Sequence, residues 1–424
     1  MRTDEIRNAD RGRRRPLDGI RILALEQMQA LPYATQLLGH LGAEVVKIEH
    51  PERGDTARFG MPWIEDADGR RAGATFLRNN LSKRSVALDL KTDEGRDLVK
   101  RLVPRFDVVC ENFTPGTSAR LGLDYAALRP LDPGLVYCAV SGFGQLDETP
   151  YEGFPAYAPI VEAMSGMYEP TRRDGEKPEI VTAGALGDNA AALFAVIGIL
   201  AALRHRDATG EGQMVDIAMY DAMIALIDMV PFLSSMGAPP AWATSGSQGV
   251  NDAFRAKDGY FVVTVLRPHH FERLARFLGH PEWLTDSAFD GLRAQAEQVD
   301  GPIRTAIEEW ARDKTKIEAA QQLAAEGIAA GASHVADDIA ADPHVATRNM
   351  LIEVDRPDAD TPFRVVGNPV KLSASPEGPV TRFPMLGEHT REVLREELGL
   401  DDDALADLAE RGILHLGGAA PSPT

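Results

Sequence analysis

Short β-branched runs alternate with helical stretches from Pro16 onward, and this alternation most limits the folds open to the chain. Strands are predicted over residues 21–25, 44–48, 85–88, 107–110 and 135–140, and helices over residues 32–41, 92–103 and 125–128. Strands joined through helices form a parallel sheet with helices on both faces. The first half of the chain is therefore predicted to be a Rossmann-like α/β domain.

Two of the expected helices have clear local signals. Residues 92–103 place Leu98 and Leu102 one helical turn apart, with Thr92 as the expected N-cap. Residues 188–205 are rich in alanine and strongly apolar, which predicts a long and mostly buried helix. A further helix is expected over residues 216–229, after a short strand.

Proline, glycine, serine and methionine are frequent in residues 231–247, which predicts a linker. The smaller mixed α+β domain beyond it is expected to contain a strand over residues 259–265 and helices over residues 268–278, 303–311 and 316–322. A charged helix is expected over residues 388–397, in the C-terminal segment. We therefore predict a flexible tail over 1–15, a large domain over 16–230, a small domain over 231–350, and a segment, 351–424, that returns to the large domain.

The charge balance excludes several classes of partner. The 424 residues include 64 acidic and 45 basic side chains, for a net charge of −19. Such a protein repels nucleic-acid phosphate and anionic lipid, so any anion must bind in a local cationic pocket. No run of 18 uninterrupted apolar residues is present, and Cys110 and Cys138 lie in apolar runs typical of buried thiols. We expect a cytoplasmic protein with no nucleic-acid or membrane partner.

Several well-known catalytic and cofactor motifs are missing. The turn after the first predicted strand runs from Glu26 to Pro32 without the glycines that bring a backbone close to a dinucleotide. No phosphate-binding P-loop, H-E-x-x-H metal motif or G-x-S-x-G elbow occurs. We therefore expect no catalytic metal, no permanently bound cofactor and no hydrolase triad of that kind.

Asp188 stands out because it follows Gly187 at the start of the long apolar helix. The pattern alone favours a simple helix-capping aspartate. The same position, however, sets a carboxylate beside free backbone N–H groups, which would hold it ionised and stabilise negative charge on a neighbouring carbonyl. Asp188 is thus also a candidate nucleophile.

Six motifs occur in an order that resembles the class III CoA-transferases, a group that includes formyl-CoA and carnitine CoA-transferases and α-methylacyl-CoA racemases. They are PLDG (16–19), LGHLGAEVVKIE (38–49), SKRS (82–85), ENFTPG (111–116), GD (187–188) and TGEGQ (209–213). The resemblance is dense over residues 16–230 and extends to KDG (257–259) and LGEHT (386–390). It implies a two-domain α/β enzyme that forms an interlocked homodimer.

The resemblance also implies roles for individual residues. Asp188 matches the catalytic aspartate, which takes the acyl group from an acyl-CoA such as succinyl-CoA and then passes CoA to a carboxylic acid. Gln29 matches a glutamine that supports the oxyanion beside the reacting carbonyl. The positions that contact CoA, a substrate here, are matched by Met28, Lys83, Arg84, Asn112, Phe113, Arg120 and Met219.

Departures from the family pattern narrow this expectation. Phe154 stands where the racemases have a proton-transferring histidine, and a phenylalanine cannot exchange protons. Ser141 and Phe143 replace a basic residue and a tyrosine of the formyl-CoA transferases, which disfavours oxalate and formate as substrates. His50 replaces an arginine that binds CoA in some relatives, and Arg53 or Arg58 is a candidate substitute. A racemase or epimerase, and a non-catalytic CoA-binding protein, remain the alternatives.

Overall fold

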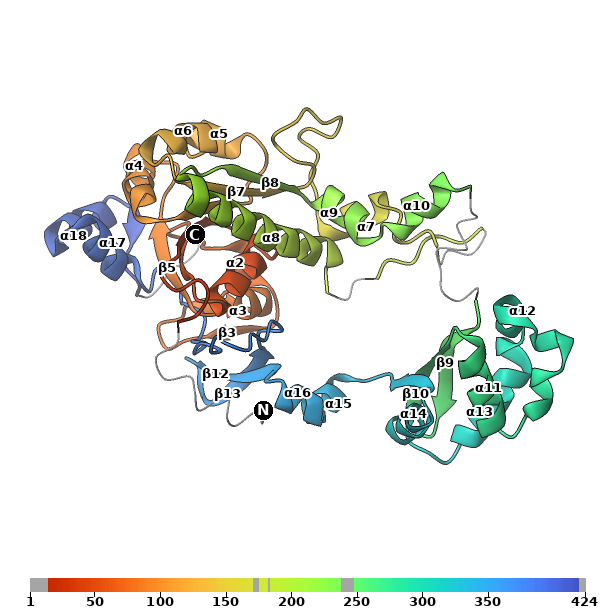
Figure 1. Cartoon of the computed structure of the whole chain (residues 1–424). Coiled ribbons are helices and arrows are strands. Elements are labelled where there is room, and N and C mark those ends of the chain that lie inside the picture. Colours follow the sequence, from red (N-terminus) through yellow and green to blue (C-terminus); the bar gives the residue numbers. More distant parts are fainter. Residues whose placement is uncertain (1–13, 171–174, 182–183, 238–247, 419–424) are drawn as a thin grey trace. The chain divides into compact units, whose positions relative to one another are not determined.

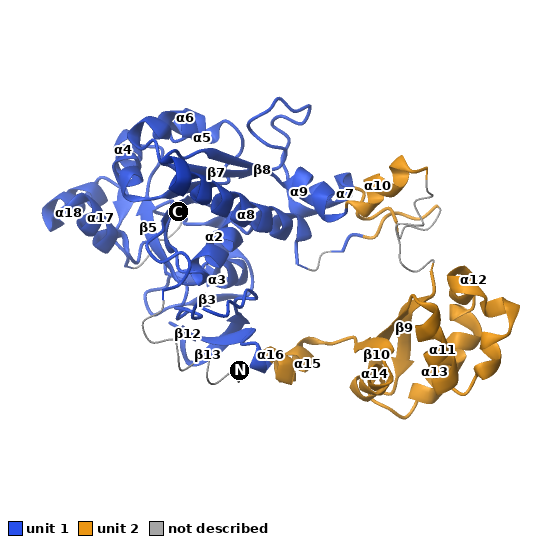
Figure 2. Cartoon of the chain, in the orientation of Figure 1, with its two compact units in different colours: residues 1–165, 180–227, 346–424 blue, residues 166–179, 228–345 orange. Residues whose placement is uncertain are grey.

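The computed structural model describes residues 14–170, 175–181, 184–237 and 248–418, so most of the predicted tail over residues 1–15 lies outside the described residues. The chain divides into two compact units (Figure 2). Unit 1 contains residues 1–165, 180–227 and 346–424, and unit 2 contains residues 166–179 and 228–345. Each unit has its own buried apolar core.

A seven-stranded sheet forms the centre of unit 1, with strand order β14-β5-β2-β1-β6-β7-β8. Neighbouring strands are parallel except at β14, which runs antiparallel to β5. The strands are β1 (Arg21–Leu25), β2 (Glu44–Glu49), β5 (Lys83–Leu88), β6 (Val108–Glu111), β7 (Val136–Ser141), β8 (Met214–Ala218) and β14 (Leu414–His415). The predicted α/β class and its parallel sheet are confirmed.

Helices cover both faces of this sheet (Figure 1). On one face, alternate strand residues such as Leu23 and Leu25 pack in one core with residues of α4 (Asp93–Leu102), α6 (Tyr125–Leu128), α17 (Thr390–Leu398) and α18 (Asp402–Glu410). On the other, α2 (Ala30–His40) packs against α8 (Leu186–Thr209), which also contacts β7 and β8. Thr92 caps α4 as predicted, because its Oγ1 accepts a hydrogen bond from the Gly95 N–H at 3.0 Å.

Shorter elements complete unit 1. They are β3 (Trp63–Glu65), β4 (Arg71–Gly73), α3 (Ala74–Asn79), α5 (Thr117–Leu121), α7 (Ala158–Met164), α9 (Met219–Leu226), β12 (Leu351–Arg356) and β13 (Ala359–Val366), with 3-10 turns η1 (Thr56–Phe59), η2 (Val103–Arg105) and η3 (Arg129–Leu131). Within the described ranges, α8 is the one helix long and apolar enough to cross a membrane, with a mean hydropathy of 1.9. It packs on β7 and β8, but only eight of its 24 residues are buried, so the prediction of a mostly buried helix is wrong.

Unit 2 is built on an antiparallel sheet with strand order β11-β10-β9. Its elements are α10 (Met229–Ser235), β9 (Val250–Ala256), β10 (Gly259–Val265), α11 (Pro268–Phe277), η6 (Pro281–Leu284), η7 (Ser287–Phe289), α12 (Gly291–Glu297), η8 (Val299–Ile303), α13 (Arg304–Ala311), α14 (Lys316–Ala325), β11 (Ala329–Ala332) and α15 (Ala336–Ala341), and α16 (Pro343–Thr347) spans its boundary with unit 1. Phe254, Phe261 and Leu274 lie fully buried in its core.

The prediction of one helix over residues 216–229 is wrong. Residues 214–218 pair with β7 as strand β8, and the helical residues that follow divide into α9 and α10. The predicted linker over residues 231–247 is also wrong at its start, because α10 continues to Ser235. Pro231 lies in the first turn of that helix, where the missing N–H is tolerated. Residues 238–247 lie outside the described part of the chain.

Candidate active site

A cavity of about 770 Å³ lies at the carboxyl ends of β1, β6 and β7, where open α/β sheets bind their ligands. We call it the Asp188 cavity. Its wall is formed by the loops after these three strands, residues 154–159, the first turn of α8 and Met219 of α9. Of the predicted site residues, it contains Asp188, Gln29, Met28, Asn112, Phe113 and Met219.

Asp188 is not the N-cap of its helix, so the capping interpretation is wrong. Helix α8 begins at Leu186 after Ala185, which places Asp188 in the first helical turn. The preceding Gly187 packs closely on α7, since a Cβ there would lie 2.8 Å from Val161 Cγ2 and 3.0 Å from Ala158 Cα. A glycine at 187 therefore allows α8 to begin at the cavity wall.

Burial raises the pKa of the Asp188 carboxyl to about 6, and the negative charge of Glu162 adds to the rise. The Arg78 charge and the Ala30 backbone N–H, which donates to Asp188, act in the opposite direction. The helix start was expected to hold Asp188 ionised, but burial acts against this, and the N–H that lowers its pKa belongs to Ala30 of α2. Asp188 is still mostly ionised at neutral pH and can attack a carbonyl.

Gln29 is held in place by hydrogen bonds from both ends of its amide. Its Oε1 accepts from Arg78 at 2.5 Å, and its Nε2 donates to Asn189 Oδ1 at 3.1 Å and to the Gly184 carbonyl at 3.4 Å. Since both amide hydrogens have acceptors, Gln29 must release one of them before it can support an oxyanion. In this structure it joins the loop after β1 to the first turn of α8.

Two backbone conformations at the cavity were not predicted. Met28 and Ala185 have φ values of 64° and 46°, in the left-handed region that residues other than glycine seldom adopt. Both residues line the Asp188 cavity. Backbone strain of this kind often occurs at functional sites. Neither residue is a glycine, asparagine or aspartate, so the sequence carries no signal for these conformations.

The Asn112 side chain fixes the loop after β1 by bonding to the backbone of that loop. Its Oδ1 accepts from the Gln27 N–H at 2.8 Å, and its Nδ2 donates to the Gln27 carbonyl at 2.9 Å. Phe113, the next residue, lines the Asp188 cavity and also a second cavity beside it. Arg120 lines neither cavity, but its Nη2 donates to Oγ1 of Thr117, which lines both, at 2.7 Å.

Lys83 and Arg84 do not reach either cavity. The fully buried Lys83 Nζ lies 2.6 Å from Glu26 Oε1 and also donates to the Pro32 carbonyl and to Asn80 Oδ1, so all three of its hydrogens are used. Arg84 forms ion pairs with Glu44, Glu392 and Glu396. The structure places both cations in intramolecular pairs, and we do not include them in the proposed CoA site.

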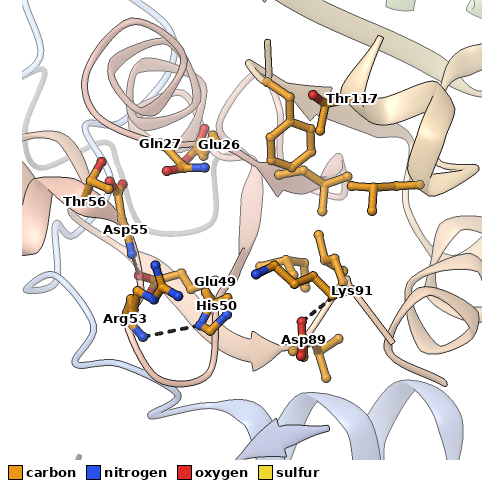
Figure 3. Close-up of a pocket in the computed structure, with 17 residues that line it drawn as sticks. Glu26, Gln27, Glu49, His50, Arg53, Asp55, Thr56, Asp89, Lys91 and Thr117 are labelled. Atoms are coloured by element: carbon orange, nitrogen blue, oxygen red, sulfur yellow. Dashed lines mark hydrogen bonds between the residues drawn. The ribbon is translucent and has the colours of Figure 1, made fainter. Parts of the chain in front are cut away.

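The second cavity, of about 360 Å³, lies at the carboxyl ends of β1, β2 and β5; we call it the Arg53 cavity (Figure 3). Arg53, His50 and Lys91 are its basic residues, and Figure 3 shows Arg53 beside His50. It shares Gln27, Thr56, Phe113 and Thr117 with the Asp188 cavity, so the two are adjacent. Lys91 was not predicted, although its place just after a strand was a usable signal.

Of the two arginines expected to replace the missing arginine at His50, only Arg53 lines the cavity. Arg58 is buried and pairs with Glu49, whose two carboxylate oxygens lie 2.6 Å and 2.7 Å from its guanidinium nitrogens. The His50 Nδ1 accepts the backbone N–H groups of Glu52 and Arg53, and burial lowers the pKa of its ring. Among the described residues, no group of three or more His, Cys, Asp or Glu could hold a metal ion.

Known proteins resemble this chain in both sequence and fold. A family model described as CoA-transferase family III matches residues 17–390. Succinyl-CoA:mesaconate CoA-transferase of Haloarcula marismortui is 36% identical over 91% of this chain and 97% of its own length. Formyl-CoA:oxalate CoA-transferase of Streptomyces avermitilis is 34% identical, over 94% and 99%. The crystal structure of a CAIB/BAIF family protein from Brucella suis matches with a TM-score of 0.78 and 30% identity, over 91% of this chain and 100% of that one.

Proposed function

The chain belongs to CoA-transferase family III, and from this premise we propose that Asp188 carries CoA between an acyl-CoA donor and a carboxylic acid acceptor. The observation that supports this proposal is the position of Asp188. Its carboxylate lines a cavity that adjoins a second cavity with basic residues, as a nucleophile beside a bound CoA thioester must. The first donor to test is succinyl-CoA, which the Haloarcula relative is named for.

The proposed route has four steps. The Asp188 carboxylate attacks the thioester carbonyl, the carbon–sulfur bond breaks, and a mixed anhydride and a CoA thiolate form. The thiolate attacks the aspartyl carbonyl and expels the donor acid, which leaves an aspartyl-CoA thioester. The acceptor carboxylate attacks this thioester to give a second anhydride and the thiolate again, and the thiolate then takes the acceptor acyl group and frees Asp188.

Every nucleophile and leaving group on this route is an anion, so no step requires a proton. This fits Phe154, which lines the Asp188 cavity and cannot transfer one. A racemase would need a second proton carrier besides Asp188 to exchange the α-hydrogen. The cavity therefore favours CoA transfer over racemisation.

The decisive experiment crosses a panel of acyl-CoA donors with carboxylic acids and follows exchange of the CoA ester. Hydroxylamine added during turnover should trap Asp188 as a hydroxamate, since it reacts with an anhydride or a thioester at that residue. Incorporation of solvent deuterium at the α-carbon without CoA exchange would instead identify a racemase. Binding of CoA with neither result would identify a non-catalytic CoA-binding protein.

Arg53 and Lys91 are the proposed partners of the CoA phosphates, so Arg53→Ala and Lys91→Ala should each raise the KM for acyl-CoA about tenfold, with a much smaller change in kcat. The cause is the loss of a charge-assisted hydrogen bond to a phosphate. Initial rates at low and high salt check this. Salt screens the attraction between these side chains and the phosphates, so the difference in KM between variant and wild type should be smaller at high salt. Arg129→Ala, which removes an exposed arginine outside both cavities, is the control, and an equal effect there would contradict the assignment.

We also propose a homodimer. Leu193 and Ile197 lie one turn apart on α8 and are 49% and 60% exposed, and Ile160 of α7 is 47% exposed. Apolar side chains gathered on neighbouring helices are typical of a protein interface. Sedimentation equilibrium should give twice the 46.0 kDa chain mass, and Ile197→Arg should lower that mass. A single-chain mass at all concentrations would contradict the dimer.

A further inference from the structure

Asp55 is a buried carboxylate that contacts both the loop beside the Asp188 cavity and the buried Lys47. It is 1% exposed, and it lies in the turn between β2 and η1 that also supplies Arg53 and Gly54 to the Arg53 cavity. Its Oδ2 lies 2.8 Å from Lys47 Nζ, and the Lys47 side chain is fully buried. Its Oδ1 accepts hydrogen bonds from the N–H groups of Ala57 at 2.8 Å and Met28 at 2.9 Å.

The bond to Met28 holds a residue in an unfavourable conformation. Met28 has a φ of 64°, and its side chain is 43% exposed, so side-chain packing contributes little to fixing this conformation. Lys47, the ion-pair partner of Asp55, donates from Nζ to the Glu26 carbonyl at 3.0 Å. One buried ion pair thus fixes the loop on both sides of Gln27.

This loop leads directly into the nucleophile's surroundings. Gln29 and Ala30 follow Met28, and they are the N-cap and first residue of α2. Ala30 donates its N–H to the Asp188 carboxylate and lowers its pKa, while Gln29 contacts Asn189 on the same turn as Asp188. A change at Met28 would therefore act on Ala30, which donates to Asp188, and on Gln29, which contacts the neighbouring Asn189.

We propose that Asp55 is a positioning residue for the transfer reaction, acting through Met28 and Ala30 on Asp188. The inference rests on the proposed role of Asp188 as the nucleophile. Asp55 lines the Arg53 cavity but not the Asp188 cavity, so its effect reaches the reacting atoms through the loop after β1.

Asp55→Asn should lower kcat about 10²-fold, because a small displacement of positioned groups costs a rate factor of that size. The asparagine has one oxygen, so it loses either the Lys47 interaction or the Met28 bond. Because Asp55 also lines the Arg53 cavity, the KM for acyl-CoA is measured as well, and the fold-change in kcat should exceed the fold-change in KM. The acid limb of the kcat–pH profile should move to higher pH, since Asp188 loses the N–H that lowers its pKa. A role confined to folding would leave this limb in place.

A double-mutant cycle with Met28→Gly gives the sharpest test. Glycine adopts positive φ freely, so in the Met28→Gly background the loop conformation depends less on the hydrogen bond to Asp55. The loss in kcat caused by Asp55→Asn should then be several-fold smaller in Met28→Gly than in the wild type. An equal loss in both backgrounds would overturn the proposal.

A second pair of variants keeps the test valid if Asp55→Asn does not fold. Met28→Pro removes the donated N–H and cannot adopt positive φ, whereas Met28→Gly keeps the N–H and allows that conformation. Met28→Pro should therefore have a kcat at least tenfold below that of Met28→Gly, and equal values would count against Asp55. Wild-type CoA exchange and hydroxylamine trapping are measured first, and their absence would overturn the proposed function rather than this inference.

Discussion

Asp188→Asn is expected to lower the kcat of CoA exchange by about 10³-fold or more, because the amide cannot form the anhydride on which every later step depends. In the wild-type enzyme, activity should also fall at acid pH. The pKa of Asp188 is raised to about 6, so kcat/KM should drop as pH falls through that value and the nucleophile becomes protonated. Steady-state rates between pH 5 and 8 measure both effects.

The same substitution should stabilise the fold at neutral pH. A carboxyl whose pKa is raised in the folded state costs stability as pH rises from its ordinary value of 3.8 through about 6. Asparagine has no charge to bury, so the Tm advantage of Asp188→Asn should be larger at pH 7.5 than at pH 4. Asp207→Asn, an exposed position in the last turn of the same helix, is the matched control. A nearly normal kcat in Asp188→Asn would contradict the proposal that Asp188 is the nucleophile.

Arg58→Met is expected to destabilise the fold by about 3–5 kcal/mol, because it removes the arginine that is ion-paired with the buried Glu49. The Arg58 and Glu49 side chains are 3% and 1% exposed, and the guanidinium also lies 3.6 Å from the centre of the Phe76 ring. The loss should be smaller at acid pH. Burial acts to raise the pKa of Glu49, but Arg58, Lys47 and Ser85 together lower it in the native protein. Without Arg58 that pKa should rise, which favours the neutral acid as pH falls.

Chemical denaturation at pH 7 and at pH 4.5 measures this difference. Arg96→Met provides the control, since it removes an arginine paired with a highly exposed aspartate, Asp93, in unit 1. If Arg58 contacted CoA instead, Arg58→Met would raise the KM for acyl-CoA and leave the free energy of unfolding unchanged. That outcome would return Arg58 to the CoA site and contradict the buried pair.

The strands could be predicted because this sheet is buried on both faces. β7 is buried at every position, and β1 at all but its first, so each reads as an uninterrupted apolar run. A short strand was expected where β8 lies, but its end could not be predicted as easily, because its residues are mostly half-buried and lead without a break into the helical residues of α9. Its identity as a strand comes from its pairing with β7, which is a contact between distant parts of the chain.

The candidate site was predictable where sequence order fixes position, and not where it depends on side-chain direction. Asp188 was singled out by its place at a helix start, whereas Asn112 and Phe113, which line the same cavity, were implied by the family resemblance. Lys83 and Arg84 are neighbours on β5, and neighbouring strand residues point to opposite faces. Lys83 therefore pairs with Glu26, whereas Arg84 pairs with Glu44. These partners lie far away in the sequence, so the residues around 83 and 84 do not predict them.

The wall that the two cavities share has a consequence for the CoA thiolate that is released from the donor. If the nucleotide part of CoA stays beside Arg53 while the acyl carbonyl reacts beside Asp188, the liberated thiolate remains tethered through its own pantetheine arm. A tethered nucleophile attacks at an effective molarity far above any cellular thiol concentration. CoA then need not dissociate from the protein between its reaction with the donor and its reaction with the acceptor. Only the two small acids have to enter and leave in each catalytic cycle.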